Sequence, residues 1–131
     1  MIKRISDIIF SLSGLLCFSP ILILFLISVW RYDKKSPLYI SPRIGKNGKI
    51  FNLIKIRTMT VDADKKGISS TSDNDTRIIP IGQKIRKYKI DELTQLFNVL
   101  IGNMSLVGPR PNVKSEVDLY TETEQNLLSV K

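Results

Sequence analysis

Residues 8–30 read IIFSLSGLLCFSPILILFLISVW, a run without a single charged side chain. As one straight helix this run would be about 35 Å long, enough to cross the hydrocarbon core of a bilayer. No small-residue cleavage site follows it, because the chain continues as RYDKK, so a secretory signal peptide is not expected. The sequence therefore predicts a membrane anchor over residues 1–35 and a polar domain over residues 36–131.

A proline in the middle of the run indicates a particular geometry for the anchor. Pro20 follows Ser19, where it removes a helical hydrogen bond and crowds the preceding turn. The Ser19 hydroxyl can bind carbonyl groups freed by such a break. Each half would be about 18 Å long, too short to cross the bilayer. Positive side chains flank both ends, as expected if both stay on the cytoplasmic side: Lys3, Arg4, Arg31, Lys34 and Lys35. This predicts a re-entrant helix–break–helix, with a single spanning helix as the alternative.

Composition limits the chemistry of the polar domain. The chain has 131 residues, a formal net charge of +8 and a pI of about 9.7. A basic excess suits an anionic membrane surface, a phosphorylated substrate or nucleic acid. No nucleic-acid-binding motif is present, so no nucleic-acid partner is expected. The chain has no histidine, and its single cysteine, Cys17, lies inside the apolar run. Acid, base or nucleophilic roles therefore fall to carboxylates, lysines, tyrosines or hydroxyl groups.

The first part of the polar domain has the pattern of a β-hairpin. Two runs rich in β-forming residues, residues 38–44 and 50–57, flank the sequence KNGK. Asn47 and Gly48 suit a type I′ turn, which needs positive φ at both central positions. The hairpin region carries five basic residues: Arg43, Lys46, Lys49, Lys55 and Arg57. They are either simply solvated or part of a phosphate-binding face.

Helical patterns follow, so the predicted fold class is α+β. Residues 61–77, VDADKKGISSTSDNDTR, read as a long loop, either a functional lid or a flexible connector. A short helix is predicted within residues 78–88, after Pro80. The apolar residues Leu93, Leu96, Phe97 and Leu100 then repeat with helical spacing, and Gly102 is placed to end that helix.

Adjacent carboxylates stand at the predicted start of this last helix. Asp91 suits an N-cap, and Glu92 in a first turn complements the helix dipole. The alternative is chemical: a carboxylate can attack phosphorus, and its neighbour can hold a divalent cation that neutralises phosphate charge. Downstream, the sequence GPRP holds Arg110 between two prolines, Pro109 and Pro111, where a guanidinium could bind phosphate oxygens.

Taken in order, these pieces resemble the bacterial sugar transferase family, the monotopic phosphoglycosyl transferases. The matching pieces are a charged N-terminus, an apolar segment with Ser19-Pro20, RIGKNGKIFNLIKIRTM, RIIPIG, DELTQLFNVL and MSLVGPRP. They cover nearly the whole chain. Each piece is weakly diagnostic by itself, whereas all of them in this order are highly specific.

The resemblance implies a transfer of sugar phosphate from a UDP-sugar to a polyprenyl phosphate, usually undecaprenyl phosphate, with release of UMP. It implies that Asp91 is the nucleophile of a ping-pong reaction and that Glu92 coordinates Mg²⁺. Lys55, Arg86, Arg110 and Pro111 would line the phosphate site, to which the hairpin adds Arg57 as a candidate. Ser19 and Pro20 would form the break that keeps the anchor re-entrant. The expected location is the bacterial inner membrane, with the catalytic domain in the cytoplasm and lipids as partners.

The resemblance also has a departure. Family members usually continue with a PGITG-like element soon after a segment like residues 127–131, so the chain is expected to be C-terminally truncated. The alternative to an active transferase is therefore an inactive membrane-anchored fragment or a scaffold that binds anionic lipids. The identity of the sugar is not indicated by these residues.

Overall fold

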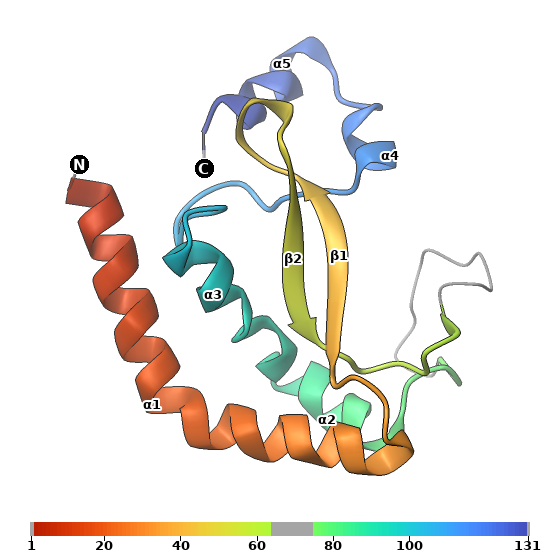
Figure 1. Cartoon of the computed structure of the whole chain (residues 1–131). Helices are drawn as coiled ribbons and strands as arrows, with labels where there is room; N and C mark the ends of the chain where they lie inside the picture. Colours follow the sequence, from red (N-terminus) through yellow and green to blue (C-terminus); the bar gives the residue numbers. More distant parts are fainter. Residues whose placement is uncertain (1, 64–74, 131) are drawn as a thin grey trace. The chain divides into compact units, whose positions relative to one another are not determined.

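The computed structural model describes residues 2–63 and 75–130. Within these ranges the chain combines helices with one antiparallel two-stranded sheet, as Figure 1 shows. In chain order the elements are α1 (Ile2–Asp33), β1 (Leu38–Ile44), η1 (Lys46–Gly48), β2 (Ile50–Ile56), α2 (Pro80–Lys87), η3 (Ile90–Glu92), α3 (Gln95–Leu100), α4 (Lys114–Val117), α5 (Glu122–Gln125) and η4 (Asn126–Ser129). The mixed helix and hairpin composition confirms the predicted fold class. Residues 64–74, which include most of the predicted loop, lie outside the described ranges.

The long apolar run lies in α1, which has the length and composition needed to cross a membrane. Most of its large apolar side chains are exposed on the helix surface. The helix α1 includes Ser19 and Pro20, and the predicted break at these two residues stays a prediction. A proline fixes φ near the helical value, and neighbouring groups can satisfy the backbone around it within a long apolar helix.

The described elements fall into two compact units. Unit 1 contains Met1–Cys17, Ile40–Ile54 and Gln95–Lys131, and unit 2 contains Phe18–Tyr39 and Lys55–Thr94. Each unit combines segments that are distant in sequence, because α1 and both strands contribute to both units. The predicted division into a membrane anchor, residues 1–35, and a polar domain, residues 36–131, stays a prediction.

In unit 1 the hairpin turn has the expected geometry. Asn47 (φ 57°) and Gly48 (φ 72°) both adopt positive φ, and the Lys49 amide donates to the Lys46 carbonyl at 3.3 Å. The positive φ values confirm the prediction from KNGK. Strand β2 ends at Ile56, one residue earlier than predicted.

Also in unit 1, the first turns of α1 are bonded to the end of α3. The Arg4 guanidinium donates to the carbonyls of Val99 and Leu100 at 2.6 and 2.7 Å, where the last carbonyls of a helix lack helical partners. The buried Asp7 carboxylate accepts from the Leu106 amide at 3.2 Å. Gly102 (φ 90°) ends α3 as predicted, because its amide donates back to the Val99 carbonyl at 3.0 Å.

In unit 2 the segment after β2 organises α2. The Ile79 amide donates to the Thr58 carbonyl at 3.0 Å, directly before α2 begins. Gly82, in the first turns of α2, lies so close to Thr58 that a Cβ atom there would stand 2.2 Å from the same carbonyl oxygen. The buried side chains Ile79 and Ile85 attach α2 to the core. This packing holds α2 against the strand end and so fixes the segment that follows α2.

Candidate active site

The carboxylates Asp91 and Glu92 lie together in the short helix η3 of unit 2. After α2, Lys89 adopts a left-handed conformation (φ 54°), which turns the chain before η3 begins. The Glu92 amide donates to the Lys89 carbonyl at 3.2 Å, closing the turn. The buried Thr94 hydroxyl donates to the Asp91 carbonyl at 3.0 Å. These hydrogen bonds thus fix the backbone that carries the carboxylate pair.

Asp91 is not the N-cap that its position in the sequence suggested. The cap of η3 is Lys89, and no side chain caps that helix. The following helix, α3, begins only at Gln95, so the helix predicted from Leu93 onward starts later. The 3-10 helix η3 and the hydrogen bond from the Thr94 hydroxyl to the Asp91 carbonyl occupy the segment before α3. The Asp91 side chain is therefore not used in capping and is half-buried beside basic groups.

Lys55 lies beside the pair. Its Nζ lies 3.8 Å from Glu92 Oε1, and the two side chains are 18% and 39% exposed, respectively. Lys55 directly precedes Ile56, the last residue of β2, so the strand delivers the ammonium group to the carboxylates. The fold thus brings together two of the residues that the sequence placed in one site.

The electrostatics at Asp91 have opposing causes. Burial raises the pKa of Asp91 above its usual value, and the charge of Glu92 acts in the same direction. The positive charges of Lys55 and, more weakly, Arg86 lower it. A carboxylate that is partly desolvated and held beside fixed cations has the setting of a reactive group.

Arg86 is held in place by α2 and the segment after β2. Its Nε donates to Thr58 Oγ1 at 2.8 Å. Its charge also acts on Asp75, the carboxylate that pairs with Arg77 at 2.6 Å. The hydrogen bond from Arg77 is the main reason that the pKa of Asp75 is lowered to about 2. Arg86 thus lies within the electrostatic reach of both Asp91 and Asp75.

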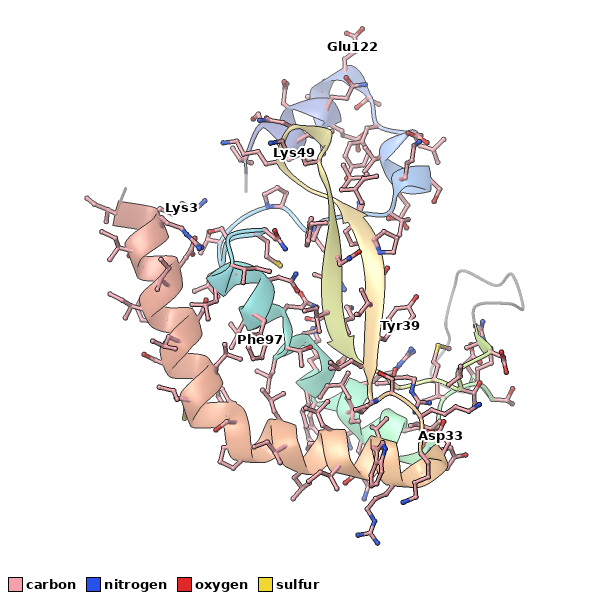
Figure 2. The ribbon with its side chains drawn as sticks, viewed as in Figure 1. Lys3, Asp33, Tyr39, Lys49, Phe97 and Glu122 are labelled. Atoms are coloured by element: carbon pink, nitrogen blue, oxygen red, sulfur yellow. The ribbon has the colours of Figure 1, made fainter. Side chains whose placement is uncertain are left out.

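Arg57, a candidate phosphate-binding residue, already has protein partners. Its guanidinium donates to both carboxylate oxygens of Asp33 at 2.8 and 2.7 Å and to the Ser36 carbonyl at 2.7 Å. Asp33 lies at the end of α1, as labelled in Figure 2. The Arg57 side chain is 7% exposed. The pair attaches the end of α1 to the chain beyond β2. It could not be predicted from local sequence, because the two residues are 24 positions apart.

Replacing Arg57 with leucine is expected to lower the free energy of unfolding by about 3 kcal/mol, because a half-buried Asp33 would lose its bidentate partner. Chemical denaturation in detergent micelles measures this change. Arg57→Lys serves as a charge-matched control and should recover part of the loss. Unchanged stability, with a raised KM for a phosphorylated donor, would instead favour a direct phosphate contact.

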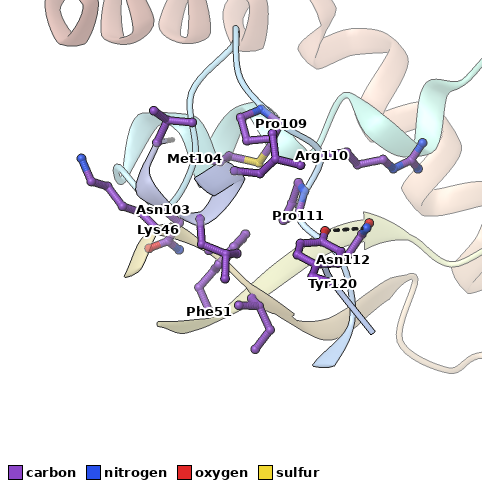
Figure 3. Close-up of a pocket in the computed structure, with 14 residues that line it drawn as sticks. Lys46, Phe51, Asn103, Met104, Pro109, Arg110, Pro111, Asn112 and Tyr120 are labelled. Carbon is purple, nitrogen blue, oxygen red and sulfur yellow. Dashed lines mark hydrogen bonds between the residues drawn. The ribbon is translucent and has the colours of Figure 1, made fainter. Parts of the chain in front are cut away.

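Arg110 and Pro111 lie in unit 1 at a shallow hollow, shown in Figure 3. The Asn112 side chain donates to the Tyr120 hydroxyl at 2.9 Å on its wall. The exposed Arg110 side chain extends away from Tyr120 in Figure 3. The lining also includes Lys46, Phe51, Asn103, Met104, Pro109 and Leu127. The predicted GPRP element thus forms a polar and aromatic hollow.

The donor set at Asp91 and Glu92 fits a magnesium ion. Mg²⁺ is commonly held by one or two carboxylates together with phosphate oxygens of a substrate. Among residues 2–63 and 75–130, no cluster of three or more histidine, cysteine, aspartate or glutamate side chains could form an all-protein metal cage. Asp91 and Glu92, beside the cations Lys55 and Arg86, are the residues that could hold such a shared metal.

The comparisons with known proteins point to one family. The family model for bacterial sugar transferases matches residues 1–131. A Bacillus subtilis (strain 168) protein with the provisional name undecaprenyl-phosphate N-acetylgalactosaminyl 1-phosphate transferase is 44% identical over 125 residues, covering 95% of this chain and 68% of that protein. The undecaprenyl-phosphate glucose phosphotransferase of Komagataeibacter xylinus is 45% identical over 112 residues, covering 84% and 21%. The UDP-glucose:undecaprenyl-phosphate glucose-1-phosphate transferase of Klebsiella pneumoniae is 36% identical over 126 residues, covering 96% and 27%. The chain therefore spans between 21% and 68% of the length of these relatives.

Proposed function

The chain belongs to the bacterial sugar transferase family, and on this basis we propose that it transfers a sugar 1-phosphate from a UDP-sugar to undecaprenyl phosphate. The observation that carries the proposal is the Asp91–Glu92 pair beside Lys55, with the charge of Arg86 acting on Asp91. This constellation offers a nucleophile, a metal ligand and two cations for phosphate. The product would be an undecaprenyl diphosphate sugar, which opens the synthesis of a surface polysaccharide or glycan.

The proposed chemistry has two balanced steps. The Asp91 carboxylate attacks the phosphorus that bears the sugar, and the bond from that phosphorus to the bridging oxygen breaks. UMP leaves with the bridging oxygen, and a phosphosugar stays bonded to Asp91 as an acyl phosphate. In the second step a phosphate oxygen of undecaprenyl phosphate attacks the same phosphorus. The carboxylate of Asp91 is then released unchanged.

Two cations and one carboxylate assist this chemistry. The positive charges of Lys55 and Arg86 reduce the electrostatic repulsion between the ionised Asp91 carboxylate and the diphosphate of the donor. Glu92 is the residue that would hold Mg²⁺, which would neutralise diphosphate charge when bound. Arg110 and Pro111 line the hollow of unit 1 and stay candidates for a phosphate contact. Arg57 acts at the end of α1 through Asp33 rather than on the substrate.

The anchor is proposed to be re-entrant, with both ends of α1 on the cytoplasmic side of the inner membrane. At its N-terminal end, Arg4 and Asp7 bind residues 99–106, which follow α1 in the chain and belong to the polar domain. At its C-terminal end, Asp33 binds Arg57 of the same polar domain. A helix that crossed the bilayer once would place its N-terminal end across the membrane from residues 99–106. These contacts therefore support an anchor that enters and leaves on one face.

The topology predicts a labelling pattern in spheroplasts. In a Cys17→Ser background, Lys3→Cys should resist a membrane-impermeant maleimide added from the periplasmic side and react only after the membrane is opened. Lys49→Cys in the hairpin turn provides the cytoplasmic control and should behave in the same way. Reaction at position 3 in sealed spheroplasts, with position 49 protected, would establish a spanning helix instead.

The transfer itself is tested with the purified chain in lipid nanodiscs that contain undecaprenyl phosphate. We expect UMP release from UDP-N-acetylgalactosamine or UDP-glucose, the donor types suggested by the names of relatives, and loss of release when EDTA removes Mg²⁺. Release that persists in EDTA would contradict the metal's role. The absence of UMP with every UDP-sugar would favour an anchored, inactive module.

A further inference from the structure

The loop that follows α3, residues 101–107, exposes several large apolar side chains. Ile101 and Val107 are 64% and 77% exposed, and Leu106 is 42% exposed. Residues 95–109 contain no charged side chain, although 24% of the whole chain is charged. A single exposed apolar residue needs no explanation, whereas several in one short uncharged segment mark a surface that meets an apolar partner.

This loop is attached to the first two turns of α1, and all of the residues concerned belong to unit 1. Arg4 donates to the carbonyls of Val99 and Leu100, directly before the loop, at 2.6 and 2.7 Å. Asp7 accepts from the Leu106 amide at 3.2 Å. Figure 1 shows α3 beside the first half of α1. The loop therefore lies at the same level along α1 as Arg4 and Asp7.

The polar groups at this contact satisfy one another. The amides of residues 101–103 donate back to carbonyls of α3 at 2.9 to 3.0 Å, and the Leu106 amide donates to Asp7. Irregular backbone occurs at membrane depth only where protein groups satisfy it, and charged side chains there are paired with other groups or with backbone. Arg4 and Asp7 meet this condition by binding α3 and the loop. The contact is thus compatible with apolar surroundings.

The helix that carries the loop is also attached to β2, within the same unit. The side chain of Asn98 on α3 is completely buried. Its Oδ1 accepts from the Ile54 amide at 3.0 Å, and its Nδ2 donates to the Asn52 carbonyl at 2.7 Å. The loop therefore begins from a helix whose position is set by both α1 and β2.

A lipid surface is the partner that fits this loop, because the neighbouring turns of α1 are apolar and exposed as well. Helix α1 has the length and composition of a membrane helix, and its residues Ile5 and Ile9 are exposed beside the loop contact. Lys3, at the start of α1, is exposed and suits anionic headgroups. A soluble protein partner would cover the loop and leave these turns of α1 uncovered. A lipid surface covers both.

We propose that loop 101–107 is a second lipid-contacting segment, held against α1 by Arg4 and Asp7. Its apolar side chains would enter the boundary between headgroups and acyl chains, as those of interfacial helices do. These side chains are Ile101, Leu106 and Val107. The proposal rests on the membrane anchor described under the proposed function. It places the GPRP element, which follows the loop directly, at the membrane surface.

The experiment measures the depth of nitroxide spin labels on the full chain in nanodiscs of anionic phospholipid, without a UDP-sugar. In a Cys17→Ser background, the label is attached at Val107→Cys or, as the matched control, at Leu119→Cys. Both positions are apolar and similarly exposed, at 77% and 82%, but Leu119 lies within the charged stretch of residues 114–124. The ratio of collisions with O₂, which dissolves in lipid, to collisions with a water-soluble nickel chelate should be several times higher at position 107. Equal ratios at the two positions would overturn the proposal.

A label at Ile9→Cys separates the loop from the anchor. Position 9 should give a ratio at least as high as position 107, because it lies on α1 itself. An embedded position 9 with a water-accessible position 107 would overturn the lipid contact of the loop and leave the anchor intact. Water access at both positions would overturn the anchor as well. Loss of UMP release with both labels embedded would contradict the proposed transfer but not the role of the loop.

Asp7 variants test what holds the loop in place. Asp7→Ala removes the acceptor of the Leu106 amide, so the label at position 107 should move toward water. Asp7→Asn keeps a side-chain carbonyl that can accept the same hydrogen bond, and the label should stay at the wild-type depth. An unchanged depth in Asp7→Ala would overturn the holding role of Asp7.

Discussion

Replacing Asp91 with asparagine is expected to abolish the phosphosugar adduct and to lower UMP release by a factor on the order of 10⁴ to 10⁶, as removal of a nucleophile does in other covalent enzymes. The amide keeps the shape of the side chain but cannot attack phosphorus. Asp118→Asn, which neutralises an exposed carboxylate after α4, is the matched control and should keep wild-type release. Radiolabelled donor and quantification of UMP provide the measurement. Full activity in Asp91→Asn would exclude this residue as the nucleophile.

The same substitution should not destabilise the fold. Burial raises the pKa of Asp91, so the folded chain binds a proton more readily than the unfolded chain does. The free energy of unfolding then falls as pH rises from the usual aspartate pKa through the raised value. At neutral pH the ionised Asp91 is destabilising, and Asp91→Asn should unfold at the wild-type temperature or above it. Loss of adduct together with retained stability separates a chemical role from a structural one.

The raised pKa also gives a direction for pH dependence. Attack on phosphorus requires the ionised carboxylate, so adduct formation should decline as the solution is acidified. The midpoint of this decline should lie above the usual pKa of aspartate, because burial outweighs the effect of Lys55 and Arg86. Single-turnover adduct formation measured across pH tests this direction. A decline only below the ordinary aspartate pKa would mean that substrate binding reverses the balance of these groups.

Gly82→Ala is expected to lower the free energy of unfolding by about 3 kcal/mol, the upper range of overpacking in a tightly packed interior. A Cβ atom at this position would lie 2.2 Å from the Thr58 carbonyl oxygen, a backbone atom that also accepts from the Ile79 amide. The start of α2 would have to move away from Thr58. Arg86, whose Nε donates to Thr58 Oγ1, would move with the helix. Stability and UMP release should therefore both fall.

Gln83→Ala is the matched control for this change. The residue is exposed on the same helix, and the substitution should alter the free energy of unfolding by no more than about 0.5 kcal/mol. Thermal and chemical unfolding in the same detergent measure both variants. A fully stable Gly82→Ala chain would show that α2 can relax without cost. The close approach to Thr58 would then not determine the position of Arg86.

Local sequence signals predicted the elements whose structure depends on nearby residues. Asn47 and Gly48 specified a turn with positive φ, and Gly102 specified a helix end, because both depend on backbone conformations that few residues adopt. Pro80 likewise marked the start of α2. The helix α1 extends through Pro20, since a proline weakens a helix but does not forbid it in a long apolar segment. The local sequence indicates only that the helix is weakened at Pro20, and the groups around the proline determine whether the helix continues.

The site was predicted only in part, for a physical reason. The motif positions named Asp91, Glu92, Lys55 and Arg86, which unit 2 brings into mutual electrostatic reach. The supporting contacts could not be predicted from spacing. Asp33 pairs with Arg57 over 24 positions and Asn98 bonds β2 over 44 and 46 positions. Such contacts depend on the tertiary arrangement, and a polar residue in an apolar pattern was the only signal available for Asn98.

Intact-mass spectrometry of the chain after brief incubation with UDP-sugar and Mg²⁺, in the absence of undecaprenyl phosphate, tests the role of Asp91 most directly. We expect a mass increase of one phosphosugar, located by peptide fragmentation on Asp91 and lost when undecaprenyl phosphate is added. Asp91→Asn should show no increase, whereas Asp118→Asn should label like the wild type. An adduct located on Glu92, or one that persists in Asp91→Asn, would contradict the assignment of Asp91 as the nucleophile.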